Sequence, residues 1–358
     1  MPLRGRKRSR NGSADRANTD YANSRHSVCV FSATARPAPT VASDSPRVRR
    51  ERDTASVRFE GRVAVVTGAG GQEPSLGRTY ARFLAERGAR VVVNDVGVGP
   101  DGRGGLAANA DQVVEEIVAL GGEAVADTHS VATSSTAKQV VDTALDAWGR
   151  VDILINNAGV VVFALFDEIS DDDCELILHS HLMGTLWMTR AVWPAMRRRG
   201  YGRVVNTCSS AMFGSPYNAV YGTAKAGIFG LSRGLALEGR RYGIAINAIT
   251  PQAATRKHAY LFDKSARFVE DGHVRTVDQV APAVAYLCHE TCGLNGALLY
   301  VGGGRVQEYV FARTSGIADE RLDTDSVARV RERREVIEIE QLGESSYEYF
   351  RPKPYTSG

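Results

Sequence analysis

Short apolar segments alternate with longer segments of helical periodicity between residues 57 and 305. The apolar segments are rich in β-branched residues and have few polar interruptions, as at 63–67 (VAVVT) and 90–95 (RVVVND). Continuous apolar strands of this kind are typical of a sheet that is covered on both faces. The alternation of strands and helices predicts an α/β protein with a doubly wound parallel sheet, the Rossmann fold, in a single domain.

Seven strands are predicted, at 63–67, 90–95, 123–128, 151–156, 202–207, 244–249 and 297–301. Helices are predicted at 75–87, 107–120, 134–148, 170–178, 181–199, 219–242 and 276–287. The alternation then stops, although 324–339 is charged and has helical periodicity. We therefore expect a seven-stranded domain over 57–305, followed by a helical and extended arm over 306–358.

Residues 1–56 have no sustained apolar period and are expected to be disordered. They contain twelve Arg and Lys against five Asp and Glu, whereas the whole chain has a net charge of +3, so the remainder is acidic. This basic extension has three readings: a nucleic-acid-binding tail, a targeting address, or translation from a misplaced start upstream of the true one. We do not expect a nucleic-acid partner.

Hydrophobic residues make up 43% of the chain and charged residues 24%, as in ordinary soluble globular proteins. No apolar run approaches the roughly 20 residues of a membrane-spanning helix, so no membrane partner is expected. Five scattered cysteines argue against a disulfide framework and for a reducing, cytoplasmic location. Cys288 and Cys292 have no second ligand pair nearby, so no metal is expected.

Tyr221 and Lys225 lie four residues apart in a predicted helix, which places both side chains on one face. A free tyrosine titrates near about 10 and is a poor base at neutral pH. A nearby ammonium favours the phenolate and lowers its pKa, as a proton shuttle at a hydroxyl-bearing carbon requires. The pair by itself also fits an ordinary amphipathic helix face, so other motifs must decide between the two interpretations.

A glycine-rich segment, TGAGGQEPSLG over residues 67–77, joins the first predicted strand to the first predicted helix. Glycines let the backbone turn tightly and approach a pyrophosphate, whose charge the helix N-terminus favours. This position in an α/β chain favours a dinucleotide site over simple helix initiation. Contacts with the cofactor are expected from Gly68, Gly71, Ser75, Leu76 and Gly77.

Asp95 ends the second predicted strand, roughly 20 residues beyond the glycines. A carboxylate there accepts hydrogen bonds from the adenosine ribose and repels a 2′-phosphate. The sequence therefore predicts NAD as the cofactor. Arg78 is the opposing signal, because its guanidinium could pair with the 2′-phosphate of NADP.

Gly68, Asp95, the Asn156-Asn157-Ala158-Gly159 segment and Tyr221-x-x-x-Lys225 occur in one order. In this the chain resembles the short-chain dehydrogenase/reductase family over about residues 58–305. Within the family it is most similar to the (3R)-hydroxyacyl-CoA dehydrogenase part of the peroxisomal multifunctional enzyme. The resemblance implies a Rossmann fold, nicotinamide-dependent interconversion of a secondary alcohol and a ketone, and a homotetramer or dimer.

The resemblance also implies a role for each matching residue. Tyr221 would be the acid/base, and Lys225 would hold the nicotinamide ribose and lower the pKa of the phenol. Further cofactor contacts are implied at Asn157, Ala158, Gly159, Pro251 and Thr255. The glycine loop departs from the family pattern, because Gln72-Glu73-Pro74 is inserted and Ser75 replaces the second glycine.

Two other departures concern the catalytic residues. The substrate-orienting serine of the family lies about thirteen residues before the tyrosine, where this chain has Cys208. Ser209 and Ser210 follow it, and we choose Ser209 because a thiol is the weaker donor. His181 stands where many members have the asparagine of a proton relay, so it is either a relay residue or a packed histidine.

The substrate pocket is expected to have a lid at 257–275, with Tyr260, Leu261, Phe262 and Phe268, and a wall of Met212, Phe213 and Tyr217. This composition fits steroids, terpenoid alcohols and hydroxyacyl thioesters alike. The alternative function is a non-catalytic NAD-binding or scaffold protein of the same fold, which the altered glycine loop would permit.

Overall fold

The computed structural model describes residues 57–99, 103, 109–255, 269–270, 273–318, 321–332 and 336–340. The predicted N-terminal extension, the greater part of the predicted lid and residues 341–358 lie outside this set. The described residues contain no helix that is long and apolar enough to span a membrane.

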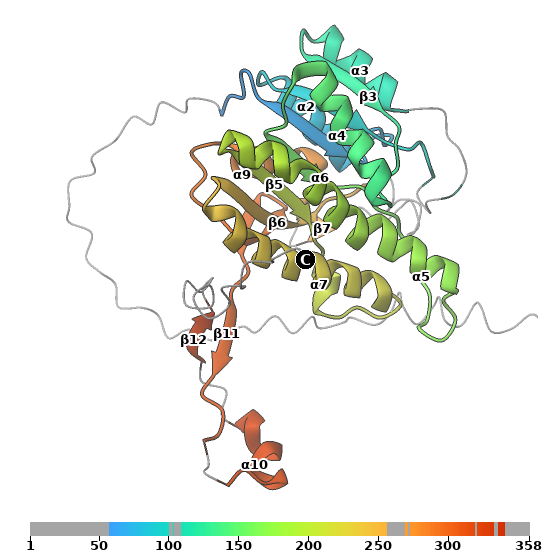
Figure 1. Cartoon of the computed structure of the whole chain (residues 1–358). Helices are drawn as coiled ribbons and strands as arrows, with labels where there is room; N and C mark the ends of the chain where they lie inside the picture. The colour runs from blue at the N-terminus through green and yellow to red at the C-terminus, as the bar shows by residue number, and fades with distance from the viewer. Residues whose placement is uncertain are drawn as a thin grey trace, which may run out of the picture. The chain divides into compact units, whose positions relative to one another are not determined.

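The core of the fold is an eight-stranded sheet in the order β10-β9-β6-β5-β4-β1-β2-β3 (Figure 1). Its parallel strands are β1 (Val63–Thr67), β2 (Arg90–Asn94), β3 (Glu123–Asp127), β4 (Ile153–Asn156), β5 (Gly202–Thr207), β6 (Ile244–Gln252) and β9 (Leu298–Gly302). These are the seven predicted strands, and the Rossmann-like α/β prediction is confirmed.

The eighth strand, β10 (Arg305–Glu308), was missed and pairs antiparallel with β9. Gly303 and Gly304 form the two-residue connection, with φ of +59° and +72°. Two successive positive φ angles are what a tight hairpin requires, and glycine adopts them without a Cβ clash. The sheet therefore continues beyond residue 305, where the domain was expected to end.

Helices cover both faces of the sheet, so it is the middle layer of three (Figure 1). One face packs against α2 (Leu76–Ala85), α3 (Asn109–Ala119) and α9 (Ala281–Cys288). The other packs against α4 (Ser134–Trp148), α6 (Gly184–Arg199) and α7 (Ala219–Arg240). Residues 63–66 of β1 alternate between the two cores, which explains why this run is continuously apolar.

Three predicted helices differ from those observed, one of them at 276–287, where a 3-10 turn, η3 (Val277–Gln279), precedes α9. Between α5 (Asp171–Leu178) and α6 the chain forms a π-helical turn, η1 (His179–Met183). The predicted helix at 324–339 is only partly correct: α10 (Thr324–Ala328) and a short turn are followed by β12 (Val336–Glu340). β12 pairs with β11 (Phe311–Thr314), a non-local contact that local periodicity cannot reveal.

Candidate active site

The predicted site residues gather at the carboxyl edge of the sheet, where α/β folds bind their ligands. Thr67, at the end of β1, ties two of the motifs together. Its Oγ1 accepts hydrogen bonds from the backbone N–H groups of Asn157 and Ala158, at 3.0 and 3.1 Å. The Asn157 side chain in turn donates to the carbonyls of Thr67 and Gly68. The glycine loop and the segment after β4 therefore form one rigid unit.

The glycine loop has the close backbone approaches that a pyrophosphate site needs. Gly68 has a φ of +64°, and a Cβ there would lie 2.8 Å from the Cα of Ala158. A Cβ on Gly77 would collide with the carbonyl of Gly68. Ser75 is the N-cap of α2 but makes no side-chain capping bond, so its hydroxyl is not used by the helix. These residues fit the dinucleotide expected here.

The inserted residues fold onto helix α2. The Glu73 carboxylate accepts a hydrogen bond from Arg82 at 3.0 Å and lies 3.8 Å from Arg78. Arg78 is buried and also forms a two-point ion pair with Glu116 of α3. The Arg78 guanidinium, which was the signal in favour of NADP, is therefore already paired with carboxylates of the protein.

Asp95 lies half-buried just beyond β2 and shapes the loops around it. Its two carboxylate oxygens accept hydrogen bonds from the backbone N–H groups of Gly70 and Gly97, both at 2.9 Å. Pro251 lies near the end of β6, opposite Val301 of β9. Thr255 follows β6 at the last described position before the predicted lid.

Tyr221 lies in the first turn of α7, and its phenol is hydrogen-bonded to the Ser209 hydroxyl. Burial raises the pKa of Tyr221, and the bond from Ser209 offsets only part of this effect. The sequence predicted a lowered pKa for Tyr221. For the protein without a bound cofactor this prediction is wrong, because desolvation of the phenolate has the largest effect. Lys225 is buried, with Nζ 5.6 Å from the Tyr221 ring centroid and 2.6 Å from the carbonyl of Thr207, to which it donates.

The three residues that could orient the substrate have different surroundings in the structure. Cys208 is buried, its thiol lies 3.6 Å from the carbonyl of Lys225, and burial raises its pKa to about 12. The Ser210 hydroxyl accepts a long hydrogen bond from Gln252, at 3.5 Å. Ser209, the N-cap of the 3-10 turn η2 (Ser210–Phe213), is the residue that contacts Tyr221.

His181 is buried in η1 and contacts both neighbouring motifs. Its Nε2 lies 2.7 Å from the carbonyl oxygen of Val160 and 3.1 Å from the Val160 nitrogen. Its ring packs edge-on against Tyr221, with centroids 5.1 Å apart. A Cβ on Gly159 would collide with the imidazole. The histidine thus packs between the Asn157–Gly159 segment and Tyr221, and its relay role stays a prediction.

The family model for short chain dehydrogenases matches residues 62–259, which contain the whole of this constellation. The chain belongs to the short-chain dehydrogenase family.

Relatives of this short-chain dehydrogenase include the peroxisomal multifunctional enzyme type 2 of Mus musculus, which is 43% identical over 261 residues. That alignment covers 73% of this chain and 34% of the mouse enzyme, so the chain spans about a third of that relative's length. A crystal structure of a short chain dehydrogenase from Mycobacterium avium is 34% identical, with a TM-score of 0.66, covering 77% of this chain and 96% of that one. A 7α-hydroxysteroid dehydrogenase in complex with NADH is 27% identical, with a TM-score of 0.62, covering 69% and 95%.

These likenesses confirm the predicted family and the resemblance to the peroxisomal multifunctional enzymes. They support an oxidoreductase that acts on CH–OH groups with a nicotinamide cofactor. Sequence reasoning missed Thr67 as the residue that joins the two cofactor motifs, although Thr67-Gly68 opens the glycine segment. It also missed Tyr309, which packs against Phe213 of η2.

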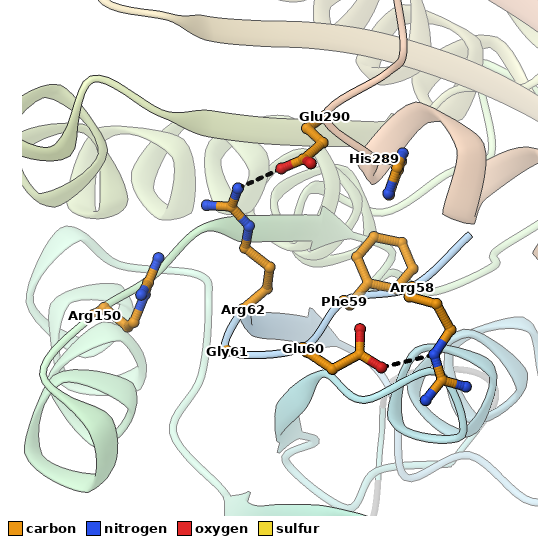
Figure 2. Close-up of a pocket in the computed structure, with 8 residues that line it drawn as sticks. All are labelled: Arg58, Phe59, Glu60, Gly61, Arg62, Arg150, His289 and Glu290. Carbon is orange, nitrogen blue, oxygen red and sulfur yellow. Dashed lines mark hydrogen bonds and ion pairs between the residues drawn. The ribbon is translucent and has the colours of Figure 1, made fainter. Parts of the chain in front are cut away.

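A separate pocket of about 430 Å³ lies at the opposite, amino edge of the sheet (Figure 2). It is lined by Arg58, Phe59, Glu60, Gly61, Arg62, Arg150, His289 and Glu290. Its cations pair with carboxylates: Arg58 with Glu60, and Arg62 with Glu290, both at 2.7 Å. None of the predicted catalytic residues lines this pocket, and its charges are balanced within the protein.

Proposed function

We propose that the chain is an NAD-dependent oxidoreductase that interconverts a secondary alcohol and a ketone. The observation that carries this proposal is the position of the Tyr221 ring, whose centroid lies 5.6 Å from Nζ of the buried Lys225, with the Ser209 hydroxyl lowering the pKa of the phenol. This group lies at the same sheet edge as the glycine loop and Asn157, where a dinucleotide fits.

In the oxidative direction Tyr221 accepts the proton of the substrate hydroxyl as a phenolate. Ser209 donates a hydrogen bond to the substrate oxygen and stabilises the charge that develops there. The Lys225 ammonium, held by the carbonyl of Thr207, favours the phenolate electrostatically. A bound nicotinamide would supply the acceptor for the C–H hydride.

Tyr221→Phe removes the proton acceptor and keeps the ring that packs on His181. We expect turnover of secondary alcohols to be abolished while the Kd for NADH, measured by fluorescence titration, stays nearly unchanged. Full activity of this variant would overturn the assignment. The alternative of a non-catalytic scaffold predicts NADH binding without turnover in the unchanged chain as well.

Asp95 and the occupied Arg78 support NAD over NADP. A carboxylate near the ribose repels a 2′-phosphate, and Arg78 is already bound by Glu116 and Glu73. We expect Asp95→Asn to lower the ratio of kcat/KM for NAD⁺ to that for NADP⁺ by about tenfold, since one lost charge contact of about 1.4 kcal/mol gives this factor. Glu123→Gln, at an exposed ion pair of the neighbouring strand, is the control. An unchanged ratio in Asp95→Asn would contradict the role.

For the substrate class, the support comes from the resemblance to the (3R)-hydroxyacyl-CoA dehydrogenase part of the peroxisomal multifunctional enzymes. It favours a 3-hydroxyacyl thioester, to be compared with steroid and terpenoid alcohols in one kinetic panel. The expected homodimer or homotetramer is tested by light scattering of the full chain. The cytoplasmic location stays a prediction, to be tested by imaging the tagged chain, because the mouse relative is named as peroxisomal.

A further inference from the structure

The first part of the C-terminal arm, residues 305–314, is attached to the catalytic domain on two sides. Beyond β10, the backbone N–H of Tyr309 donates to the carbonyl of Leu298 on β9 at 2.9 Å. Two residues later Phe311 stacks on Phe229 of α7, with ring centroids 5.0 Å apart and planes at 16°. This segment lies beyond residues 62–259, the part of the chain that the family model matches.

Between these two anchors the Tyr309 ring contacts the substrate-orienting turn. Its centroid lies 5.0 Å from that of Phe213, the last residue of η2. Phe213 is 53% exposed, so the rest of the protein covers its ring only in part. Tyr309 also packs on the buried cluster of Cys208 and Leu298.

The opposite side of η2 lies against the catalytic helix. A Cβ on Gly222 would lie 2.7 Å from the carbonyl oxygen of Ala211, so α7 approaches the turn closely next to Tyr221. The turn is therefore held between α7 and the arm, and Ser209 is its N-cap. A movement of η2 would move the Ser209 hydroxyl relative to the phenol.

We propose that Tyr309 is a positioning residue, which holds η2 so that Ser209 stays in hydrogen-bond contact with Tyr221. The inference rests on the proposed function, because it assigns to the arm a part in the same active site. It predicts that residues outside the family-matched segment set the catalytic efficiency of this chain.

The pH profile gives a readout that a purely structural role would not move. The groups that face Tyr221 are Cys208 and Ser209 from the β5–η2 segment, His181 from η1 and Lys225 on α7 itself. Of these, the Ser209 hydroxyl lowers the pKa of Tyr221 by its hydrogen bond. If Tyr309 is lost and Ser209 moves away, the pKa of Tyr221 rises, and alcohol oxidation needs a higher pH.

The test compares Tyr309→Ala with Tyr309→Phe, which keeps the ring, in the full-length protein. We expect Tyr309→Ala to lower kcat by about two- to tenfold, the factor that corresponds to one aromatic pair. The rising limb of the pH profile for kcat should move to higher pH, while the Kd for NADH stays unchanged. Tyr309→Phe should keep the kcat and the pH profile of the original protein. Val310→Ala, at an exposed neighbour on the same arm, is the matched control.

A double-mutant cycle with Ser209→Ala tests the route of the effect. Because Tyr309 acts through Ser209, Tyr309→Ala should cause no further shift of the pH profile in the Ser209→Ala background. Additive effects, or an unshifted profile in Tyr309→Ala, would overturn the inference while leaving the proposed function intact. If Tyr309→Ala does not fold, Tyr309→Leu takes its place, because it keeps an apolar side chain at this position and removes the ring contact with Phe213. If the protein without any substitution showed no turnover of secondary alcohols, the proposed function would be refuted, and the inference with it.

Discussion

Single residues decide how the phenol of Tyr221 can work as a base. Burial disfavours its phenolate, and the hydrogen bond from Ser209 favours it. Lys225 is fixed by the carbonyl of Thr207, so its charge stays near the ring at no further cost in side-chain ordering. The spacing of four residues predicted that Tyr221 and Lys225 would be neighbours. The balance between burial and hydrogen bonding depends on residues that are distant in the sequence.

Ser209→Ala removes the single hydroxyl donor that acts on Tyr221 in the free protein and on the substrate oxygen in the proposed complex. We expect kcat to fall by about 100- to 1,000-fold, as for the loss of one preorganised donor to a developing oxyanion. The pKa of Tyr221 should rise, because the lost bond is one that lowers it. The phenolate then forms only at higher pH, so the rising limb of the kcat profile for alcohol oxidation should shift upward.

Ser210→Ala is the control for this measurement, because Ser210 contacts Gln252 and Ser209 contacts the phenol. It should leave both the rate and the pH profile nearly unchanged. If Ser210→Ala showed the large loss and Ser209→Ala did not, the choice of the substrate-orienting serine would be wrong.

At the scale of elements, the π-helical turn η1 places His181 between two motifs. The sequence predicted two helices here, at 170–178 and 181–199, and gave no signal for a π turn between them, because three- and four-residue periodicity is almost the same in an α-helix and in one containing a single π turn. The Asn157–Gly159 segment must leave room for the imidazole, and this accounts for glycine at position 159.

Gly159→Ala should therefore destabilise the protein, because the new Cβ would collide with the His181 ring. We expect the free energy of unfolding in urea to fall by about 1–3 kcal/mol, the usual cost of overpacking. Combining it with His181→Ala, which removes the ring, should recover part of the loss. Gly230→Ala is the matched control, since it lies inside α7 with open space around it and should be neutral or stabilising. Equal stability of the two single variants would contradict this packing role.

Elements built from non-local contacts were the ones that the sequence predicted least well. β10 is fully exposed, so it has no apolar run, and its only local signal is the Gly303-Gly304 turn. β12 lies in a charged segment that also fits a helix, and pairing with β11 decides the outcome. The parallel strands, by contrast, were predicted to within three residues at each end, because burial on both faces makes most of their sequences continuously apolar.

At the scale of the whole molecule, the carboxyl and amino edges of the sheet carry different groups of residues. The residues proposed for catalysis and cofactor binding lie at the carboxyl edge, and an ion-pair cluster around the buried Asp152 lies at the amino edge. This carboxylate is fully buried and accepts hydrogen bonds from the Val63 N–H and from two guanidinium nitrogens of Arg150. It also lies 3.5 Å from Arg62, which lines the pocket in Figure 2.

Asp152→Asn should destabilise the fold without changing the active site. The substitution leaves Arg150 and Arg62 without their shared carboxylate, and breaking a buried pair costs about 3 kcal/mol or more. We expect a lower urea midpoint, while the Kd for NADH measured well below the unfolding transition stays unchanged. Glu60→Gln, at an exposed ion pair of the same edge, should change stability by no more than the small amount typical of surface pairs. A large change in NADH affinity would show instead that the two edges are coupled.

The sequence by itself determined the alternation of strands and helices, the glycine loop after β1 and the Tyr221–Lys225 pair. Each depends on residues that are close along the chain, where periodicity and backbone chemistry act directly. The tertiary structure decided which hydroxyl meets Tyr221, which carboxylates occupy Arg78, and that Tyr309 of the arm packs on η2. These contacts join segments that are far apart in the sequence, and their geometry follows from how the helices and strands pack rather than from any local pattern.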